Sequence, residues 1–469
     1  MNFDSSSIGE GANKSRKQIR NIMTNKLKLL PFQQVHAQSI ERALKKHRVA
    51  LDASEPGCGK TYVACAVAKA IGAPVVVVTT KATIPSWKQV AEGFGVNLLL
   101  VTNYELIRKG SLSECRKLSN NPTFPYFWNV PGDTLIIFDE CQKCKSRKSL
   151  NSFLLISARR RNLRLLLCSA TAATNPLEMR ALGYALGLHY LSNFYSWAYA
   201  NGVSQGHYGL EFRGGSRYLR RIHSQIFPKL GSRLRVADIH DFPEALISAA
   251  VIETGKAVEI QKEYDRMARE LKVAETTEDH ESLRRLAHEM QAKRANKLTL
   301  LTRSRQAIEK YKVDAMADMA RSALEEGMSV VLLVNFTETI CALSKALDCP
   351  NIICGGQDPQ DRENIIKRFQ RNEITTVICN ISAGGVGVSL HDPMGKRPRL
   401  SIISPTYSAS DLRQALGRVH RAGGAACVQK ICFAAGTVEE HTAELCAAKL
   451  ANLDLLNDGD VQPTFLCNR

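Results

Sequence analysis

Two series of short aliphatic runs impose the strongest constraint on how this 469-residue chain can fold. The first series lies between Val49 and Ala170, and the second begins near Lys312. Each run is a continuous β-branched or leucine stretch, which is typical of parallel strands buried on both faces. Helix-like stretches separate the runs. The pattern predicts two α/β lobes, each with a doubly wound parallel sheet. The runs are RVALDA, APVVVVTT, NLLLVT, DTLIIFDE and LRLLLCSA, then SVVLLVN, PNIIC, ITTVICN, RLSIIS and CVQKICF.

The chain between and around the two series predicts the domain organisation. Few strand signals occur between the lobes, where aromatic residues come first and a long charged helix-like part follows, so we expect a helical connector there. The N-terminus is rich in Ser, Gly, Asn and basic residues, which is typical of a flexible tail. The expected parts are a basic tail at 1–25, an N-terminal lobe at 26–186, a connector at 187–311, a C-terminal lobe at 312–452 and a tail at 453–469.

The charge balance favours a polyanionic partner. Lysine and arginine number 63 against 45 acidic residues, a formal charge of +18, and nucleic acid is the partner that such a field attracts. The alternative is an unspecific basic surface. The 14 cysteines lie mostly in apolar runs, which suggests a reducing compartment, and the CxxC pair Cys141 and Cys144 lacks a second pair at zinc spacing. No run approaches the ~18 apolar residues of a membrane span, so we expect a nuclear or cytoplasmic protein, viral ones included.

The sequence ALDASEPGCGKTYVA predicts a phosphate-binding loop between a strand and a helix. Gly57 and Gly59 let backbone N–H groups curl around a phosphate, and Lys60 supplies a point charge to the β and γ phosphates of ATP. Thr61 stands at the helix N-terminus, where its hydroxyl can coordinate Mg²⁺. A bare GxGKT occurs by chance, but the strand before it and the helix after it indicate a nucleotide site.

Two carboxylates, Asp139 and Glu140, directly follow the buried run LIIF. Side chains at the carboxyl edge of a parallel sheet lie beside the phosphate loop. We expect Asp139 to hold Mg²⁺ through water, and Glu140 to orient and deprotonate the attacking water. In isolation the pair would be an ordinary solvated turn, and the preceding GxGKT argues against that alternative.

A pair of arginines in the second lobe completes the predicted ATP site. In QALGRVHRAGG, Arg418 and Arg421 are three residues apart, which would place them on the same side of a helix. An arginine that reaches the γ-phosphate from the opposite lobe stabilises the charge of the transition state and makes hydrolysis depend on lobe closure. Without such a partner the two would be a surface pair.

In their order and spacing, these motifs resemble those of superfamily 2 helicases and, within them, of the Swi/Snf-like DNA translocases. The resemblance extends over about residues 30–450 and implies two RecA-like lobes that use ATP and Mg²⁺. The segments that carry it are LLPFQ, ASEPGCGKT, TTKATIPSWKQV, VTNYELI, FDECQKCKS at the DExH box, SATAATNP, VVLLVNF, GGQDPQDRENIIKRFQ, ISAGGVGVSL and QALGRVHRAGG.

The resemblance also implies roles for further residues. Gln33 corresponds to the glutamine that reads adenine, and Gly387 to a glycine near ATP. The residues implied to couple the ATP site to the nucleic acid, or to contact it, are Gln142, Ser169, Thr171, Gly384, Gly385 and Gln414. Two departures stand out: Gln142 replaces the histidine of the DExH box, and HRAGGAA replaces the usual HRIGQ. Glutamine can still bridge two hydrogen-bond partners, so we expect coupling to persist.

Together these features predict a monomeric ATP-dependent motor that moves on duplex DNA with little sequence specificity, targeted by protein partners or by the motor itself. The stretch RSRQAIEKYKVDAMADMARSALEEG resembles the annealing helicases, which remodel branched DNA. One alternative is a helicase that separates RNA or DNA strands, acting in transcription. Another, of a different class, is a nucleic-acid clamp that binds ATP without hydrolysing it.

Overall fold

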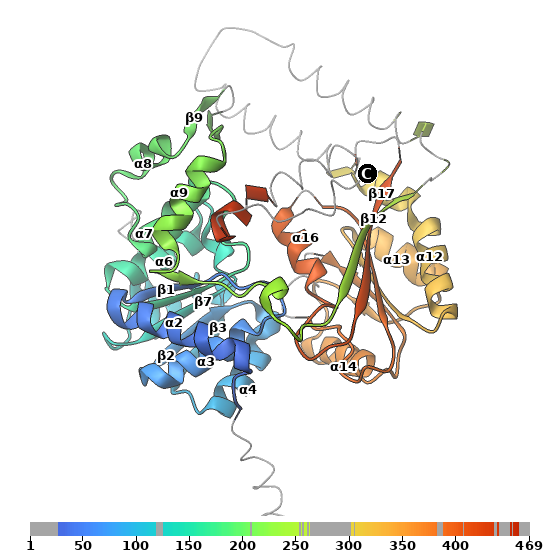
Figure 1. Cartoon of the computed structure of the whole chain (residues 1–469), viewed down its shortest axis with the longest axis horizontal. Coiled ribbons are helices and arrows are strands. Elements are labelled where there is room, and N and C mark those ends of the chain that lie inside the picture. The colour runs from blue at the N-terminus through green and yellow to red at the C-terminus, as the bar shows by residue number, and fades with distance from the viewer. Residues whose placement is uncertain are drawn as a thin grey trace, which may run out of the picture.

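Two α/β lobes lie side by side in the computed structural model of the chain (Figure 1). Each lobe contains a six-stranded sheet in which every pairing is parallel. All ten aliphatic runs form strands, which confirms the predicted fold class. The structure describes residues 27–118, 125–206, 209–252, 255, 258–259, 262, 302–303, 305–381, 388–406, 408–435, 439, 451–452 and 454–458.

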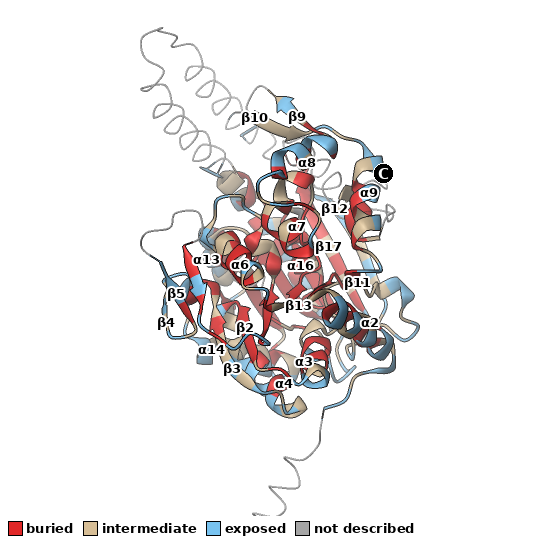
Figure 2. Cartoon of the chain, turned by 90° about the vertical axis from the view of Figure 1, so that its left-hand side faces the viewer, coloured by how far each residue is buried: buried red, intermediate tan, exposed pale blue. Residues whose placement is uncertain are grey.

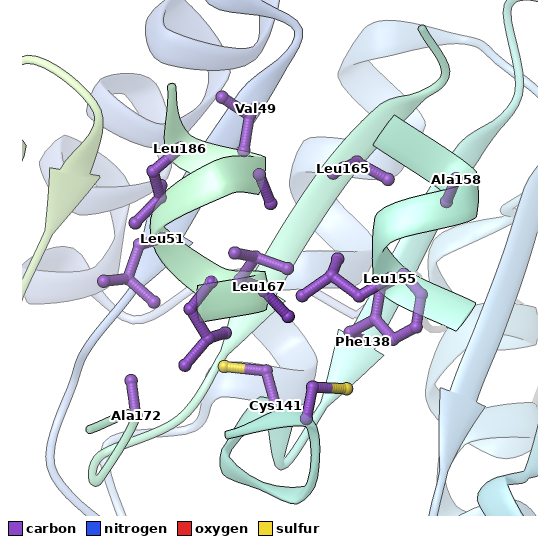
Figure 3. Packing of buried hydrophobic residues seen from close by; sticks show 14 of the residues in the cluster. Val49, Leu51, Phe138, Cys141, Leu155, Ala158, Leu165, Leu167, Ala172 and Leu186 are labelled. Atoms are coloured by element: carbon purple, nitrogen blue, oxygen red, sulfur yellow. The ribbon is translucent and has the colours of Figure 1, made fainter. Parts of the chain in front are cut away.

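The first lobe has the strand order β11-β1-β8-β7-β2-β3. Helices α2, α3 and α4 pack against one face of this sheet, and α6, α7 and α9 against the other. Alternate residues of β8 point to opposite faces, and Figure 3 shows Leu165 and Leu167 beside Ala158 and Leu155 of α6. The bounds are α2 (Pro31–His47), β1 (Val49–Asp52), α3 (Lys60–Ile71), β2 (Val75–Thr79), α4 (Ile84–Phe94), β3 (Leu98–Asn103), β7 (Leu135–Asp139), α6 (Leu150–Arg160), β8 (Arg164–Cys168), α7 (Arg180–Leu186), α9 (Ser216–Ile226) and β11 (Gly231–Ser232).

The second lobe has the strand order β12-β17-β16-β13-β15-β14. Its central strand β13 is buried along its whole length, as expected for a strand covered on both faces. Two apolar clusters, one on each face, form its core. The bounds are β12 (Ala245–Ile252), α12 (Val313–Glu325), β13 (Ser329–Val334), α13 (Thr337–Ala346), β14 (Ile352–Ile353), α14 (Pro359–Gln370), β15 (Thr376–Asn380), β16 (Arg399–Ile403), α16 (Ala409–Leu416) and β17 (Cys427–Ala434).

Strand β12 lies in the segment expected to be a helical connector. It pairs with β17 over all eight of its residues, and Figure 1 shows it as the green strand within the second lobe. The segment also contributes β11 to the first sheet. The domain boundaries remain a prediction. The segment expected to be a helical connector also contains strands. Smaller elements are α5 (Tyr104–Ile107), β4 (Ser111–Leu112), β5 (Cys115–Lys117), β6 (Tyr126–Trp128), α8 (Phe194–Ala200), β9 (Val203–Gly206), β10 (Gly209–Phe212), and the short turns Lys81–Thr83, Cys141–Cys144, Pro176–Met179 and Val236–Asp238.

Residues 454–458, expected to belong to a tail, are helical and pack against the first lobe. Leu455 and Leu456 are buried in its core, so the chain returns to this lobe after completing the second. The expected N-terminal tail, 1–25, lies outside the described residues. Within the described part of the chain, no helix has both the length and the apolar character that crossing a bilayer requires.

Candidate functional site

A cavity of about 490 Å³ lies between the two lobes at the carboxyl edge of the first sheet. This volume suits a small-molecule ligand. Both lobes contribute to its walls, so a ligand here would touch both at once. The lining residues are Lys28, Leu30, Gln33, Pro56, Gly57, Gly59, Lys60, Thr61, Tyr62, Thr83, Ser86, Asp139, Glu140 and Ala170 from the first lobe, and Ser389, His391, Gln414, Arg418, Arg421 and Ala422 from the second.

The phosphate-type loop, residues 53–59, joins β1 to α3 and forms the floor of the cavity. Gly57 and Gly59 have φ angles of +89° and +82°, a conformation that favours glycine, and Gly59 is the N-cap of α3. The ammonium of Lys60 donates to the carbonyl oxygens of Ser54 and Glu55, at 2.8 and 3.1 Å. Because an ammonium has three donors, one remains for a ligand in the cavity.

A buried polar cluster supports the start of this loop. His36 Nε2 lies 3.1 Å from Asp52 Oδ1 and 3.0 Å from Ser54 Oγ, while its Nδ1 lies 2.7 Å from Ser232 Oγ. Burial alone would raise the pKa of Asp52, but the charge and hydrogen bond of His36 hold that pKa below its ordinary value. The cluster ties α2, β1 and β11 together and fixes the backbone whose carbonyl accepts from Lys60.

Asp139 is held by three donors at the end of β7. Its Oδ2 accepts from Thr79 Oγ1 at 2.6 Å and from the indole of Trp87 at 2.8 Å. Its Oδ1 accepts from the backbone N–H of Glu140 at 3.1 Å. Burial, and then the charge of Glu140, raises the pKa of Asp139 to about 6. The carboxylate is therefore fixed in orientation at a place where a positive charge in the cavity would stabilise it.

Glu140 begins a chain of hydrogen bonds that crosses to the second lobe. Gln142 donates to Glu140 Oε2 at 2.6 Å and accepts from Ser169 Oγ at 2.6 Å, so its amide bridges two partners. The hydroxyls of Thr171 and Ser410, one from each lobe, are 2.7 Å apart. Gln414 of the second lobe donates to the same Glu140 oxygen at 2.8 Å.

Arg418 and Arg421 approach the cavity from the second lobe. Both donate to the carbonyl oxygen of Val388 at 3.2 Å. The expectation that they share a helix is wrong, because α16 ends at Leu416 and both arginines lie in the loop that follows. Burial, and then the charge of Arg421, lowers the pKa of Arg418 to about 9, and burial lowers the pKa of Arg421 to about 10. Both stay protonated at neutral pH.

Close backbone contacts bring the second lobe onto the phosphate-type loop. A Cβ atom at Gly57 would lie 2.7 Å from the carbonyl oxygen of His420, so only glycine fits there. The backbone N–H of Ala422 also donates to the carbonyl of Gly57 at 3.3 Å. Gln33 supports the loop from the other side, donating to the carbonyl of Cys58 at 2.9 Å, and its oxygen accepts from the N–H of Leu30.

The remaining expected residues divide into two groups. Gly384, Gly385 and Gly387 lie outside the described residues. Cys141 and Cys144 are free and buried, and no cluster of potential metal ligands occurs among the described residues.

Sequence reasoning missed several contributors. Trp87 and Ser410 carry no local signal, because their partners Asp139 and Thr171 are distant in sequence. His391 lines the cavity without belonging to any of the motifs. Trp87 lies in TTKATIPSWKQV, one of the segments that carry the family resemblance, and its buried indole donates to Asp139.

The cavity fits a nucleoside triphosphate with a divalent cation. One wall has an ammonium with a free donor and the two-glycine loop, where backbone N–H groups can meet phosphate. On the other wall, the Nε atoms of Arg418 and Arg421 are buried without a hydrogen-bond partner. Thr61 and Asp139 supply oxygen atoms of the kind Mg²⁺ prefers. Both walls therefore have hydrogen-bond donors available for an anion placed between them.

Comparisons with known proteins agree with this chemistry. The helicase conserved C-terminal domain family matches residues 311–423. The chain is 31% identical over 466 residues to the putative ATP-dependent RNA helicase L364 of Acanthamoeba polyphaga mimivirus, covering 93% of this chain and 84% of that protein. Similar solved structures include the Sulfolobus solfataricus SWI2/SNF2 ATPase core with dsDNA (15% identity, 93% and 94% coverage, TM-score 0.36) and S. cerevisiae Dbp5 bound to RNA and ADP BeF3 (10%, 91% and 88%, 0.46).

Both TM-scores lie below 0.5, so the assignment rests on the sequence relationships and on the two parallel-sheet lobes. The match to the mimivirus protein is both long and at least 30% identical. On these grounds the chain belongs to the superfamily 2 helicases, ATP-dependent nucleic-acid motors built from two RecA-like lobes.

Proposed function

We propose that this helicase is a translocase on duplex DNA that hydrolyses ATP in the cavity between its lobes. One observation carries the assignment of the ATP site: Lys60 and two carboxylates line one wall of the cavity, and Arg418 and Arg421 line the facing wall. Opposite charges are thus arranged on both sides of the space that a triphosphate would fill.

Each residue of the first wall has a distinct role in this proposal. Lys60 and the N–H groups of the glycine loop bind the β and γ phosphates. Thr61 and Asp139 hold Mg²⁺, which neutralises phosphate charge when bound. Glu140 orients the attacking water and accepts its proton. Gln33 has one amide N–H left after its bond to Cys58, and this donor is available for the adenine.

The second wall makes hydrolysis depend on lobe closure. Arg418 and Arg421 stabilise the negative charge that develops on the γ-phosphate only while the lobes are together. Gln414 shares Glu140 Oε2 with Gln142, so separating the lobes removes a donor from the proposed base. Ser169 and Thr171 lie on the same chain of contacts, and through it nucleic-acid binding can alter the position of Glu140. We propose that Gly384, Gly385 and Gly387 meet phosphate groups of the nucleic acid and ATP.

Duplex DNA is the proposed track because the ordered motifs resemble those of Swi/Snf-like translocases and the chain carries a formal charge of +18. Contacts between basic side chains and the DNA phosphate backbone carry little sequence information. A second candidate, a strand-separating RNA helicase, is favoured by the mimivirus relative, which is named a putative ATP-dependent RNA helicase. In this proposal either kind of motor acts as a monomer, in the nucleus or the cytoplasm.

Phosphate release by the full chain tests the ATP site. We expect hydrolysis stimulated by nucleic acid, and its loss in Lys60→Ala and in Glu140→Gln. Glu140→Gln should still bind ATP, because it removes the base but keeps the hydrogen-bonding shape, whereas Lys60→Ala should bind ATP weakly. Exposed Lys367→Ala is the matched control. Full activity in both site variants would reject the assigned site, and a wild type that binds ATP without hydrolysing it would favour an idle clamp.

The choice of track is tested by the nucleic acid that accelerates turnover most. Blunt duplex DNA, single-stranded DNA, single-stranded RNA and duplex RNA of equal length are compared at one salt concentration, because salt alters all of these affinities. Strongest stimulation by duplex DNA supports the translocase. Stimulation by RNA alone, together with release of a labelled strand from an RNA duplex, would establish the second candidate instead.

A further inference from the structure

Helix α8 of the first lobe presents exposed tyrosines that its packing does not use. Phe194 and Ala198 are fully buried, and Trp197 stacks on Phe194 with ring centroids 6.3 Å apart. Tyr195 and Tyr199 lie on the outer side and are 47% and 49% exposed. Being four residues apart, they share one side of the helix with about 5–6 Å between their Cβ atoms. Figure 2 shows exposed residues on α8 beside β9 and β10.

Exposed aromatic side chains are concentrated here. The described residues include five aromatic side chains in the exposed class, and three of them, Tyr190, Tyr195 and Tyr199, lie within ten residues of one another. The inner face of α8 is also well anchored: the His189 ring lies 5.1 Å from Phe194 and 4.9 Å from Trp197. The outer tyrosines thus stand on a fixed support, which keeps the entropy lost on binding a flat ligand small.

Helix α9, which carries three exposed arginines, begins next to the end of α8. The carbonyl of Tyr199 accepts from Gly202, whose own carbonyl accepts from the N–H of Arg213, so the chain brings α8 next to the start of α9. Arg217 stacks over the Tyr218 ring at 4.7 Å, and the outer side of α9 carries exposed Arg220 and Arg221. Helix α9, Ser216–Ile226, contains no carboxylate.

We propose that α8 and the arginines of α9 form a binding surface for unpaired nucleotides, with bases stacking on Tyr195 and Tyr199 and phosphates meeting Arg217 and Arg221. Rigid aromatic rings beside arginines are the chemistry that binds single-stranded nucleic acid without sequence preference. A protein partner would bring carboxylates to this surface, but it would not require two stacking rings. The surface lies outside the cavity between the lobes and outside the motifs that mark the motor.

This inference rests on the proposed function: a motor on duplex DNA meets unpaired bases where strands branch, and this surface would hold them. It therefore assigns the motor a preference for junctions over continuous duplex. In an RNA helicase the same surface would hold the displaced strand, because stacking does not distinguish the two sugars.

Binding of labelled 12-nucleotide strands to the full chain, without ATP, tests the surface. Oligo-dT and oligo-U are used, each beside an abasic strand of equal charge and a blunt DNA duplex. We expect Tyr195→Ala/Tyr199→Ala to weaken binding of both base-carrying strands about 30-fold or more, the loss of two stacked bases. Binding of the abasic strand and of the duplex should be unchanged. Tyr195→Phe/Tyr199→Phe should bind like the wild type, because phenylalanine keeps the stacking face.

Two further variants separate stacking from charge and from general damage. Arg217→Gln/Arg221→Gln should weaken the abasic strand as well, and should lower the salt dependence of binding, because phosphate contacts release counterions. Phe127→Ala removes an exposed ring from β6, in a separate small sheet of the same lobe, and should bind like the wild type. Equal binding by the tyrosine double variant and the wild type would overturn the proposal, as would an equal loss on the abasic strand.

ATP turnover with duplex DNA, measured on the same preparations, separates this inference from the proposed function. A tyrosine double variant that loses strand binding but keeps duplex-stimulated turnover supports the surface. If no nucleic acid stimulates the wild type, the proposed motor fails, while strand binding still decides the role of α8.

Discussion

At the scale of single residues, the second-lobe wall of the cavity concentrates positive charge in a buried place. Arg418 is 4% exposed, and the charge of its neighbour Arg421 adds to the burial that lowers its pKa. His391 lies on the same wall beside Arg421, and its Nδ1 is buried without a hydrogen-bond partner. A neutral imidazole is therefore the form that the folded protein accepts, since a protonated ring would add a third cation to this cluster.

The pH dependence of stability should reveal this histidine. Burial, then Arg421 and Arg399, lowers the pKa of His391 to about 4, against an ordinary value of 6.5. Below pH 6.5 the unfolded chain takes up the proton and the folded protein does not, so stability is lost as the pH falls from 6.5 toward 4. We expect His391→Gln to lose about 2 kcal/mol less than the wild type between pH 7 and pH 5, measured by urea unfolding. Parallel losses in the two proteins would contradict this assignment.

At the scale of elements, the short helix 454–458 links both lobes to the start of the phosphate loop. Asp458 pairs with Arg233 in a contact where both side chains are 4% exposed. Asp454 pairs with Arg413 of α16, and Arg413 also lies 3.7 Å from Glu55 of the loop. Figure 1 shows this segment between α9 and α16. The segment therefore contacts α16 of the second lobe as well as the first lobe, and the strand pattern alone does not predict these contacts.

Removing one member of the buried pair should be costly. Asp458→Ala leaves the guanidinium of Arg233 buried with only the Ala53 carbonyl and a long contact to Glu55. We expect a loss of about 2 kcal/mol in the free energy of unfolding, because the buried guanidinium loses its short hydrogen-bonded carboxylate and keeps only the longer ion pair with Glu55. Asp238→Ala, which removes an exposed partner of Arg235, is the matched control and should cost less than about 1 kcal/mol. Equal thermal shifts in the two variants would contradict the structural role of Asp458.

The elements also show where sequence reasoning succeeds. Continuous aliphatic runs identified all ten strands named in advance, because burial on both faces leaves a local signal. Strand β11 lacks that signal because it is a two-residue Gly-Ser pair. Edge strand β12 has the largely apolar sequence ALISAAVI, but residues along its length are exposed and one serine interrupts the run. The segment 454–458 is defined by partners more than forty residues away. Tertiary packing decided these elements.

The candidate site divides in the same way. The phosphate-type loop and Asp139–Glu140 are set by a strand end followed by a turn, so sequence spacing was enough to bring them together. The placement of Trp87 on Asp139, and of Ser410 opposite Thr171, depends on how layers and lobes pack. The two arginines reach one carbonyl, that of Val388, although their helix ends before them. The spacing of three residues therefore predicted correctly that Arg418 and Arg421 are neighbours, although they do not share a helix.

At the scale of the whole molecule, the contacts between the lobes converge on the cavity. Three contacts join one lobe to the other at the edge of the cavity: Thr171 with Ser410, Glu140 with Gln414, and Gly57 with Ala422. A rotation of one lobe against the other would change these contacts and with them the cavity. Nucleotide occupancy and lobe geometry are thereby linked, as a motor requires.

The net charge of +18 makes a whole-molecule prediction about nucleic-acid affinity. If six to ten phosphates are contacted, affinity should fall by about 10³ to 10⁵ between 50 and 200 mM salt, because bound counterions are released. Fluorescence anisotropy with a labelled duplex measures the slope. An affinity that hardly changes over this range would mean that phosphate contacts are few, contrary to a backbone-tracking motor.

The most direct test of the central claim is ATP turnover and ATP binding in Arg421→Ala, measured with saturating nucleic acid. Exposed Arg368→Ala in the same lobe is the control. Because Arg421 would act on charge that develops in the transition state, we expect ATP affinity to change only a few-fold while turnover falls by about 10³ or more. Wild-type turnover in Arg421→Ala would show that the cavity between the lobes does not hydrolyse ATP in the way proposed.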